Sequence, residues 1–415
     1  MSTFIDLGVP AHHIEILKGK GITSPFPIQE ATIPDLMRGR DLLGRAPTGS
    51  GKTLAFGLPL IARVGKANPR RPRALVLAPT RELAEQIARA LAPYAKASQR
   101  SVTAVYGGVG YEPQRAALKR GTDVLVATPG RLADLISAGS VSLRDVDLVV
   151  VDEADRMADM GFLPQVRHLL DMTNPVRQTA LFSATLDQEV ASLTKAYQTD
   201  PVTHQVGGDE NHGEAAHYFW QVDPNDRIEV TADIISSSTP TLVFTRTRHG
   251  ADKVARLLER RGIRAAAIHG GRSQSQRTRA LKAFGQKHVE ALIATDVAAR
   301  GIHVDGVTSV VHFDLPADHK DYLHRSGRTA RAGAGGVVVS LVMADQLGEL
   351  RKLQRQVGFH DALHDPDNGW LSVDGGSRVG ERPLPTPSTA RPTAGQPRRS
   401  RQSRQSGGRG NRRRR

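Results

Sequence analysis

The chain has 415 residues, of which 57 are basic and 42 are acidic, and it contains no cysteine. Its length predicts two or three domains, its apolar content of 39% excludes a wholly disordered protein, and the lack of cysteine excludes disulfides, thiolate metal sites and thiol nucleophiles. The net charge of +15 indicates a polyanionic partner, and the aromatic content of only 4% favours contacts with a nucleic-acid backbone over base stacking.

Neither the N-terminal segment nor the apolar runs indicate a membrane protein. Residues 1–10 lack the basic and apolar regions of a signal peptide, and the longest apolar runs are far shorter than the roughly 18 residues of a membrane helix. We therefore expect a cytoplasmic protein that does not associate with membranes. We also expect it to be a monomer.

Short apolar runs alternate with helical patterns along most of the chain. The first half predicts a helix over 82–97 and strands over 74–78, 123–127, 146–151 and 179–182. The second half predicts strands over 241–245, 265–268, 291–295, 309–313 and 337–342. This alternation is typical of parallel sheets with helices on both faces. We predict two α/β domains, residues 1–205 and 216–368, joined by a linker over 206–215.

The last part of the chain has a different composition. Residues 378–415 contain twelve arginines, no lysine and one acidic residue, which gives this segment +11 of the total charge of +15. Its few apolar residues cannot bury enough surface to fold. We therefore predict a disordered basic tail over 369–415 that acts as an auxiliary tether for a nucleic acid, with a merely solubilising end as the alternative.

A glycine-rich loop lies where a short apolar strand leads into a helix. Its glycines let backbone N–H groups wrap around a phosphate chain, a lysine can reach the outer phosphates, and a threonine hydroxyl can bind Mg²⁺. The usual pattern begins with glycine, where this loop has alanine, so an ordinary turn is the alternative. The loop consists of Ala46, Pro47, Thr48, Gly49, Ser50, Gly51, Lys52 and Thr53.

Two acidic residues, Asp152 and Glu153, directly follow a buried apolar strand. At the carboxyl end of a parallel strand, such residues face the edge where doubly wound sheets bind ligands. Asp152 suits a metal ligand, and Glu153 can orient or activate water. Carboxylates at strand ends also serve as helix caps, but the phosphate loop favours the catalytic roles.

The run Asp152-Glu153-Ala154-Asp155 resembles the motif that names the DEAD-box family of ATP-dependent RNA helicases. Other segments resemble further motifs of that family in the same order along most of the chain. They are 21–29, within a Q motif over 2–30, and then 79–84, 107–108, 128–131, 183–185, 295–301 and 324–331. The resemblance implies two tandem RecA-like domains, ATP and Mg²⁺ as cofactors, and RNA as the partner.

The resemblance also implies roles for single residues. Lys52, Asp152 and Glu153 would act on ATP, with Thr53 and Asp152 at the metal. Arg328 and Arg331 are three residues apart, so on a helix they would share a face, and they resemble the arginine fingers. Gln29 would read the adenine. Phe4 would stack on its ring or, alternatively, only anchor the core.

Further residues of these motifs match RNA-binding and coupling positions. They would contact the RNA backbone largely independently of sequence, and would couple the ATP state to RNA binding. The predicted RNA contacts are Arg81, Gly108, Thr128, Arg131 and Arg300, and the predicted coupling residues are Ser183, Thr185 and His324.

The sequence departs from the family pattern at Ile22, Ala330, Ala334 and His303, and the first three changes are mild. His303 stands where the family has a carboxylate that contacts the ATP ribose. Because imidazole can still bond a hydroxyl, we expect weaker or pH-dependent nucleotide binding. Other histidines, such as His12 and His13, show no clustering typical of ligands and are expected at the surface.

Three functions remain open from the sequence. The favoured one is an RNA-stimulated ATPase that unwinds short duplexes and remodels RNA or RNA–protein complexes. The second is an RNA clamp or annealing chaperone whose strand separation is incidental. The third is a DNA helicase of related fold.

Overall fold

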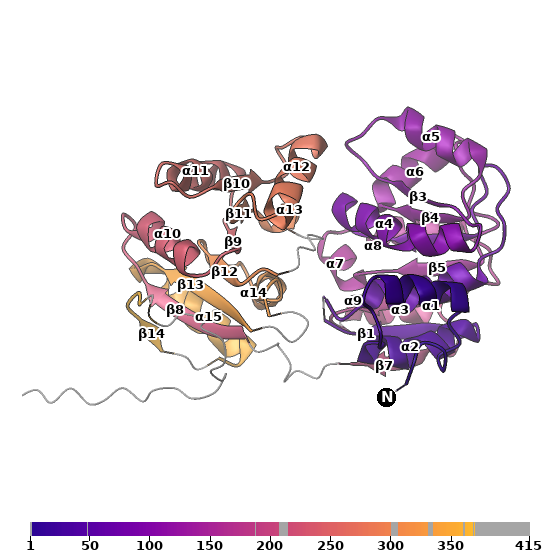
Figure 1. The fold of residues 1–415 in the computed structure, drawn as a ribbon, viewed down its shortest axis with the longest axis horizontal. Helices are drawn as coiled ribbons and strands as arrows, with labels where there is room; N and C mark the ends of the chain where they lie inside the picture. The colour runs from indigo at the N-terminus through magenta and orange to yellow at the C-terminus, as the bar shows by residue number, and fades with distance from the viewer. Residues whose placement is uncertain are drawn as a thin grey trace, which may run out of the picture. The chain divides into compact units, whose positions relative to one another are not determined.

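The computed structural model describes residues 2–47, 49–186, 188–206, 215–299, 306–330, 335–359, 362–367 and 369. These residues form two parallel sheets of seven strands each, flanked by helices (Figure 1). We call the first sheet with its helices the first lobe and the second sheet with its helices the second lobe. This architecture confirms the predicted α/β fold with two doubly wound parallel sheets.

The first sheet has the strand order β3-β4-β2-β5-β6-β1-β7. Strands β2, β4, β5 and β6 coincide with the apolar runs predicted from the sequence. Strands β3 and β7 were not predicted, because most of their residues stay partly or fully exposed and give no continuous apolar signal. The strands are β1 (Leu42–Arg45), β2 (Ala74–Leu77), β3 (Val102–Val105), β4 (Val124–Ala127), β5 (Leu148–Val151), β6 (Gln178–Ser183) and β7 (Val202–Gln205).

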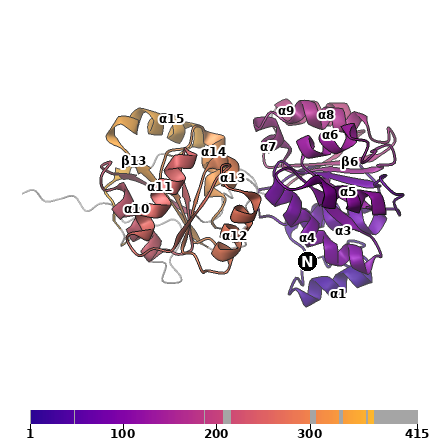
Figure 2. The ribbon, with the colours of Figure 1, turned by 90° about the horizontal axis from the view of Figure 1, so that it is seen from above.

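Alternate residues of the buried strands enter cores on opposite faces of this sheet. Val150 belongs to the core shared with α1 to α4, whereas Val149 and Val151 belong to the core shared with α6 to α9. Figure 2 shows α1, α3 and α4 on one side and α6, α8 and α9 on the other. The helices are α1 (Ala11–Gly19), α2 (Pro27–Met37), α3 (Lys52–Arg63), α4 (Arg81–Ala97), α5 (Tyr111–Arg120), α6 (Pro129–Ser137), α7 (Ala154–Asp159), α8 (Leu163–Asp171) and α9 (Gln188–Tyr197).

The second sheet has the strand order β10-β11-β9-β12-β13-β8-β14. Its strands are β8 (Ala215–Gln221), β9 (Thr241–Phe244), β10 (Ala265–Ile268), β11 (Ala291–Ala294), β12 (Ser309–His312), β13 (Gly336–Val342) and β14 (Leu363–His364). Its helices are α10 (Arg227–Ser237), α11 (Arg248–Glu259), α12 (Gln274–Gly285), α13 (Asp296–Ala299), α14 (His319–Ser326) and α15 (Leu347–Val357), with a 3-10 turn over Ala344–Gln346.

Helix α14 is fixed to the second sheet by a buried tyrosine. The hydroxyl of Tyr322 lies 2.7 Å from Nδ1 of His217, and its ring meets the ring of His312 edge-on. Arg325, on the same helix, donates two hydrogen bonds to the carboxylate of Asp296, at 2.6 and 2.8 Å. These contacts hold the position of the residues that α14 carries.

The prediction that His12 and His13 are surface groups is wrong for His13. This residue is fully buried between α1 and α4, because His13, Ile14 and Leu17 lie on the same face of α1. Nε2 of His13 lies 2.8 Å from Oγ of Ser98, and burial lowers the pKa of His13 to about 4. It is therefore a neutral core residue.

Several predicted segments lie wholly or largely outside the described residues. They include residues 207–214 of the linker and, apart from Gly369, the tail over 369–415, so both assignments and the domain limits stay predictions. No helix in the described part of the chain is long and apolar enough to cross a membrane.

Candidate functional site

The phosphate loop connects β1 to α3. Gly49 and Gly51 both have a φ of +89°, a left-handed conformation that glycine adopts readily and other residues rarely do. Nζ of Lys52 donates to the carbonyl oxygen of Ala46 at 2.8 Å, so the ammonium group lies over the loop. The N–H groups at the start of α3 suit phosphate oxygens. Thr48 lies outside the described residues.

Asp152 and Glu153 follow β5 at the carboxyl edge of the same sheet, and both are buried. Burial raises the pKa of Asp152 to about 7, and the neighbouring charge of Lys52 opposes this shift. Glu153 has a φ of +53°, and its Oε2 lies 3.0 Å from Nη1 of Arg156. A left-handed conformation is costly for a residue with a side chain, and such strain clusters at functional sites.

Thr53 and Asp152 are the residues that could hold a metal ion beside the phosphate loop. A hydroxyl and a carboxylate are hard oxygen donors of the kind that Mg²⁺ prefers. The buried Asp152 carboxylate also favours a nearby cation, because a positive charge offsets the cost of burying the ionised form. In the described parts of the chain, no three His, Cys, Asp or Glu side chains form a metal site. Phosphate oxygens and water would therefore have to complete the coordination.

Gln29 touches the phosphate loop. Its Nε2 donates to the carbonyl oxygen of Gly51, and its Oε1 accepts the N–H of Phe26, both at 3.0 Å. The amide keeps one further N–H and one lone pair with which to contact a base. The ring of Phe4 is only 3% exposed and belongs to the hydrophobic core, which favours the core-anchor alternative over stacking on adenine.

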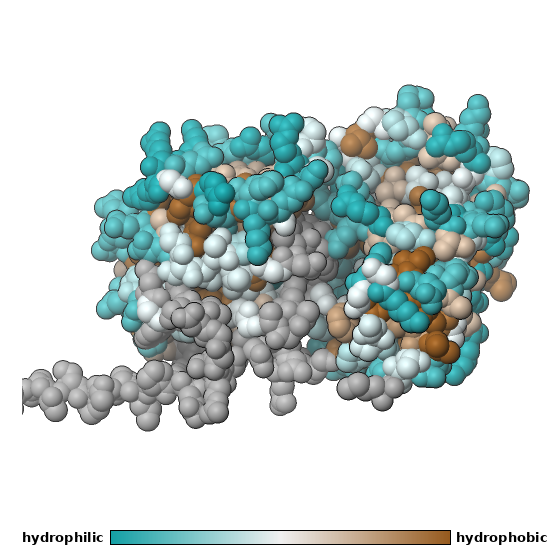
Figure 3. Space-filling model, viewed as in Figure 1, coloured by the Kyte–Doolittle hydropathy of each residue, from teal (hydrophilic) through white to brown (hydrophobic). Residues whose placement is uncertain are grey.

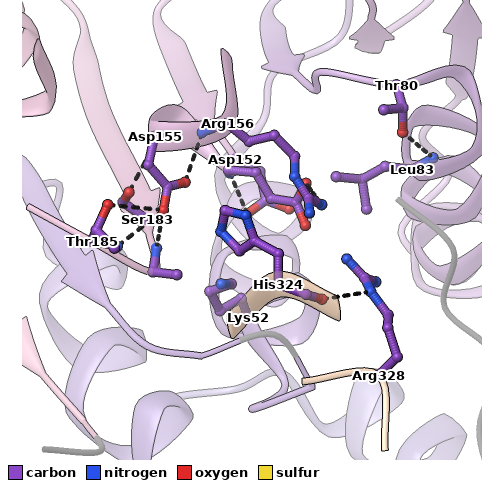
Figure 4. A network of polar contacts seen from close by, with 12 residues as sticks. Lys52, Thr80, Leu83, Asp152, Asp155, Arg156, Ser183, Thr185, His324 and Arg328 are labelled. Atoms are coloured by element: carbon purple, nitrogen blue, oxygen red, sulfur yellow. Dashed lines mark hydrogen bonds and ion pairs between the residues drawn. The ribbon is translucent and has the colours of Figure 1, made fainter. Parts of the chain in front are cut away.

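Asp155 links the acidic motif to the segment that follows β6. Its Oδ2 accepts the backbone N–H of Ala184 at 3.1 Å, the N–H of Thr185 at 3.0 Å and the Thr185 hydroxyl at 3.2 Å. The N–H of Asp155 in turn donates to Oγ of Ser183 at 3.3 Å (Figure 4). Asp155 is absent from the site residues predicted above, although its place at the end of the motif was a usable signal.

Two predicted RNA contacts, Arg81 and Gly108, lie side by side although they belong to separate segments. Arg81 begins α4, and Gly108 lies in the turn after β3 with a φ of +79°. A Cβ atom on Gly108 would lie 1.8 Å from Nη1 of Arg81. A larger residue here would be strained by this φ and would displace the Arg81 side chain, so glycine lets the backbone and the guanidinium group lie side by side.

Thr128 and Arg131 lie at the start of α6. The guanidinium carbon of Arg131 lies 3.9 Å from the ring centroid of Tyr111, and its Nη2 donates to the carbonyl oxygen of Val109 at 3.0 Å. The Tyr111 hydroxyl donates to Oδ2 of Asp134 at 3.1 Å. A tyrosine twenty residues away in sequence therefore holds Arg131 in place, and no sequence pattern pointed to it.

Two predicted site residues lie at the end of α14 and just after it: His324 is on the helix, and Arg328 lies in the turn two residues past its last residue, so the expected helical position is wrong for Arg328. Nε of the buried Arg328 donates to the carbonyl oxygen of His324 at 3.3 Å. Both residues line a small pocket to which Arg156, the partner of Glu153, also contributes. Arg300, His303 and Arg331 lie outside the described residues, so their roles stay predictions.

Contacts between Glu82 and two residues of α12 were not predicted. Oε1 of Glu82 accepts a hydrogen bond from Nε2 of Gln274 at 3.0 Å and lies 2.9 Å from Nη2 of Arg277. The side chains of Glu82 and Arg277 are both buried, so each depends on the other for its charge partner. In the sequence, Glu82 is one of two acidic residues on an amphipathic helix, and nothing marks it as paired.

One segment of the second lobe is strongly basic. Residues 246–290 contain twelve lysines and arginines but only three acidic residues. Figure 3 shows a largely hydrophilic surface over α11 and α12. The exposed basic residues there are Arg246, Arg248, Lys253, Arg256, Arg260, Arg261, Arg264, Arg279, Lys282 and Lys287. A surface of this kind suits a phosphate backbone.

Comparison with known proteins identifies the family. The DEAD/DEAH box helicase model matches residues 26–193, and the helicase conserved C-terminal domain model matches residues 226–333. The solved structure of S. cerevisiae Dbp5 bound to RNA and ADP BeF3 is 27% identical, with a TM-score of 0.80 over 90% of this chain and 98% of that chain.

Curated relatives give the same answer. The probable ATP-dependent RNA helicase ddx17 of Dictyostelium discoideum is 41% identical over 82% of this chain and 45% of its own length. The DEAD-box ATP-dependent RNA helicase CshA of Geobacillus kaustophilus is 38% identical over 86% of this chain and 76% of its own length. The chain spans between 45% and 66% of the length of three such relatives. The chain belongs to the DEAD-box helicase family.

Proposed function

We propose that this protein is an ATP-dependent RNA helicase that couples RNA-stimulated ATP hydrolysis to local unwinding of short duplexes and to remodelling of RNA or RNA–protein complexes. The observation that carries the proposal is the Asp155 network. Asp155 follows Asp152 and Glu153 in the chain, and its own hydrogen bonds reach Ser183 and Thr185. A change at the phosphates can therefore reach a segment outside the nucleotide site.

The residues of the first lobe have separate tasks in this proposal. Lys52 and the N–H groups of the loop bind the ATP phosphates, and Glu153 orients the attacking water. Thr53 and Asp152 would hold a Mg²⁺ ion, which neutralises phosphate charge when it is bound. Gln29 contacts the adenine. Because these groups are buried, bulk water screens their interactions with the phosphates only weakly.

The second lobe supplies a cation and an RNA-binding surface. Arg328 stabilises the charge that develops on the transferred phosphate, with Arg331 as the second finger. Arg300 also binds the RNA backbone, together with Arg81, Gly108, Thr128 and Arg131 of the first lobe. The RNA-bound state of the Dbp5 structure and the basic surface over α11 and α12 support RNA as the partner.

The proposal is tested by measuring ATP hydrolysis with single-stranded RNA, duplex RNA and single-stranded DNA of one sequence. We expect stimulation by RNA and not by DNA, together with ATP-dependent release of a short RNA duplex over many turnovers. Equal stimulation by DNA would instead support the DNA helicase alternative. Multiple-turnover duplex release that persists after Glu153→Gln would favour the clamp or annealing chaperone.

The histidine at position 303 gives a first testable prediction. If His303 replaces a carboxylate that contacts the ribose, His303→Asp should tighten ATP binding, because a carboxylate accepts hydroxyl hydrogen bonds more strongly than imidazole does. Titration calorimetry with ATP and with 2′,3′-dideoxy-ATP separates the ribose contribution. The mutant should gain affinity only for ATP. An unchanged or weaker affinity for ATP would remove His303 from the ribose site.

The arginine-rich tail gives a second prediction. Deletion of residues 369–415 should raise the RNA concentration needed for half-maximal ATPase activity and leave the maximal rate nearly intact. Each RNA phosphate that the shortened protein no longer binds should flatten the salt dependence of single-strand binding by about 0.7 log units per decade of salt. A full-length variant with every tail arginine changed to glutamine separates charge from chain length. An unchanged salt slope in both variants would show that the tail does not bind RNA.

A further inference from the structure

Arg45 lies next to the phosphate loop but belongs to none of the motifs described above. It is the last residue of β1, which lies between β6 and β7, and it directly precedes Ala46. The residue is half-buried, and its Nε donates to the carbonyl oxygen of Ala184 at 3.2 Å. Arg45 therefore reaches from the strand that leads into the phosphate loop to the segment that carries Ser183 and Thr185.

The main chain at the end of β1 brings three segments together. Arg45 pairs with Ser183 of β6 on one side and with Gln205 of β7 on the other. The N–H of Ala46 donates to the carbonyl oxygen of Ser183 at 3.1 Å. The N–H of Val206 donates to the carbonyl oxygen of Arg45 at 2.9 Å. The phosphate loop, the segment after β6 and the chain that leads toward the predicted linker therefore all start beside Arg45.

Charged side chains hold both backbone groups of Ala184. Oδ2 of Asp155 accepts its N–H at 3.1 Å, and Nε of Arg45 donates to its carbonyl oxygen. Hydrogen bonds with one ionised partner are about twice as strong as neutral ones. Asp155 belongs to the acidic motif and is drawn with Ser183 and Thr185 in Figure 4, whereas Arg45 belongs to the strand before the phosphate loop. Ala184 is thus tied to both parts of the nucleotide site.

Binding of a phosphate would act on this strand through Lys52. Nζ of Lys52 donates to the carbonyl oxygen of Ala46, the residue after Arg45. A phosphate oxygen competes with that carbonyl for the ammonium group, because an ionised acceptor forms the stronger hydrogen bond. A shift of Ala46 then reaches Arg45 along the chain, and it reaches Ala184 through the Arg45 side chain.

We propose that Arg45 is a positioning residue whose Nε hydrogen bond transmits the state of the phosphate loop to residues 183–185, so that strand separation depends on ATP hydrolysis. The inference rests on the proposed function, because it presumes that the loop binds ATP. Arg45 acts through Ala184 and is therefore not a catalytic residue. When its hydrogen bond is removed, Ala184 keeps its bond to Asp155 but loses the side-chain link to β1. ATP hydrolysis then continues with less duplex released for each ATP.

The test compares Arg45→Met and Arg45→Gln in the full-length protein. The two new side chains have similar length and shape, but glutamine places the donor Nε2 where arginine has Nε, and methionine places a methyl group there. The readout is the amount of short RNA duplex released per ATP hydrolysed, measured in one reaction. Arg45→Met should lower this ratio about tenfold, because a hydrogen bond from a charged group contributes at least that much. Arg45→Gln should restore most of the ratio.

The matched control is Arg40→Met, at the opposite end of β1. Arg40 is exposed, and its Nη2 donates to Oδ2 of Asp200 at 3.4 Å, so the substitution removes an arginine that does not contact Ala184. This variant should keep the wild-type ratio. The Tm of each variant shows whether it is folded, and Arg45→Ala, which also lacks the donor, replaces Arg45→Met if that variant does not fold.

The inference is overturned if Arg45→Met keeps the wild-type ratio, including the case in which hydrolysis and duplex release fall together. It is also overturned if Arg45→Gln loses as much as Arg45→Met, since the hydrogen bond would then not matter, or if Arg40→Met loses as much. If RNA does not stimulate ATP hydrolysis by the wild-type protein, the proposed function itself is contradicted. The two failures are therefore distinguishable.

Discussion

Glu153→Gln is expected to lower the RNA-stimulated rate of ATP hydrolysis by about 100-fold or more, because a positioned general base typically contributes 10²–10⁴. Glutamine has nearly the same shape, so it can still accept the hydrogen bond that Arg156 donates to Glu153. It cannot accept a proton from water. The loss should therefore appear in the rate of the chemical step, measured by single-turnover hydrolysis, while ATP affinity changes little.

The control for this variant is Glu112→Gln, which removes one negative charge from an exposed position on α5. Its hydrolysis rate should equal that of the wild type. If Glu153→Gln hydrolysed ATP within threefold of the wild-type rate, Glu153 would be a structural partner of Arg156 rather than a catalytic residue. If ATP affinity and rate fell together and Tm fell as well, the buried pair would be chiefly structural.

The sheets were predictable because their central strands are buried on both faces. The continuous apolar run of residues 148–151 is such a strand, and the two acidic residues after it mark the ligand edge. Edge strands β3 and β7 could not be found in this way, because an exposed face leaves no continuous run. The fold class depended on the central strands, so missing the edges did not alter it.

Residue positions that follow from motifs were easier to predict than positions that depend on packing. Lys52 and Asp152 do lie at the same edge of one sheet, because parallel strands bring their carboxyl ends together. Spacing alone could not reveal that Phe4 turns into the core while Phe26 remains exposed. The burial of His13 was equally hidden, because its helix face becomes clear only when α4 packs against it.

The sequence showed only partly how the charge is distributed over the protein. The tail carries most of the net charge, but a small net charge on the remainder does not imply an even distribution. The structure collects exposed arginines and lysines on α11 and α12, and acidic residues elsewhere balance them in the total. The folded part therefore offers a broader surface for phosphate than its net charge suggests.

Arg328→Gln is expected to reduce the maximal rate of RNA-stimulated ATP hydrolysis by about 10³-fold, since a cation that neutralises the transferred phosphate contributes 10³–10⁵ in related phosphoryl-transfer reactions. Arg328 is buried in the turn after α14, and its Nε donates to the carbonyl oxygen of His324, which fixes the direction of its side chain. Arg328→Lys should recover little activity, because a lysine ammonium lacks the planar fork that can hold two phosphate oxygens. The measurement is the maximal rate at saturating RNA and ATP.

The matched control is Arg260→Gln, which removes an exposed arginine just beyond the C-terminal end of α11 and should leave the maximal rate unchanged at saturating RNA. A side chain that acts only on RNA would, when removed, raise the RNA concentration needed for half-maximal activity and spare the maximal rate. If Arg328→Gln behaved in that way, Arg328 would belong to the RNA surface. If only the maximal rate falls and the affinities for RNA and ATP stay intact, the charge of Arg328 acts in the transition state and not on the bound substrates.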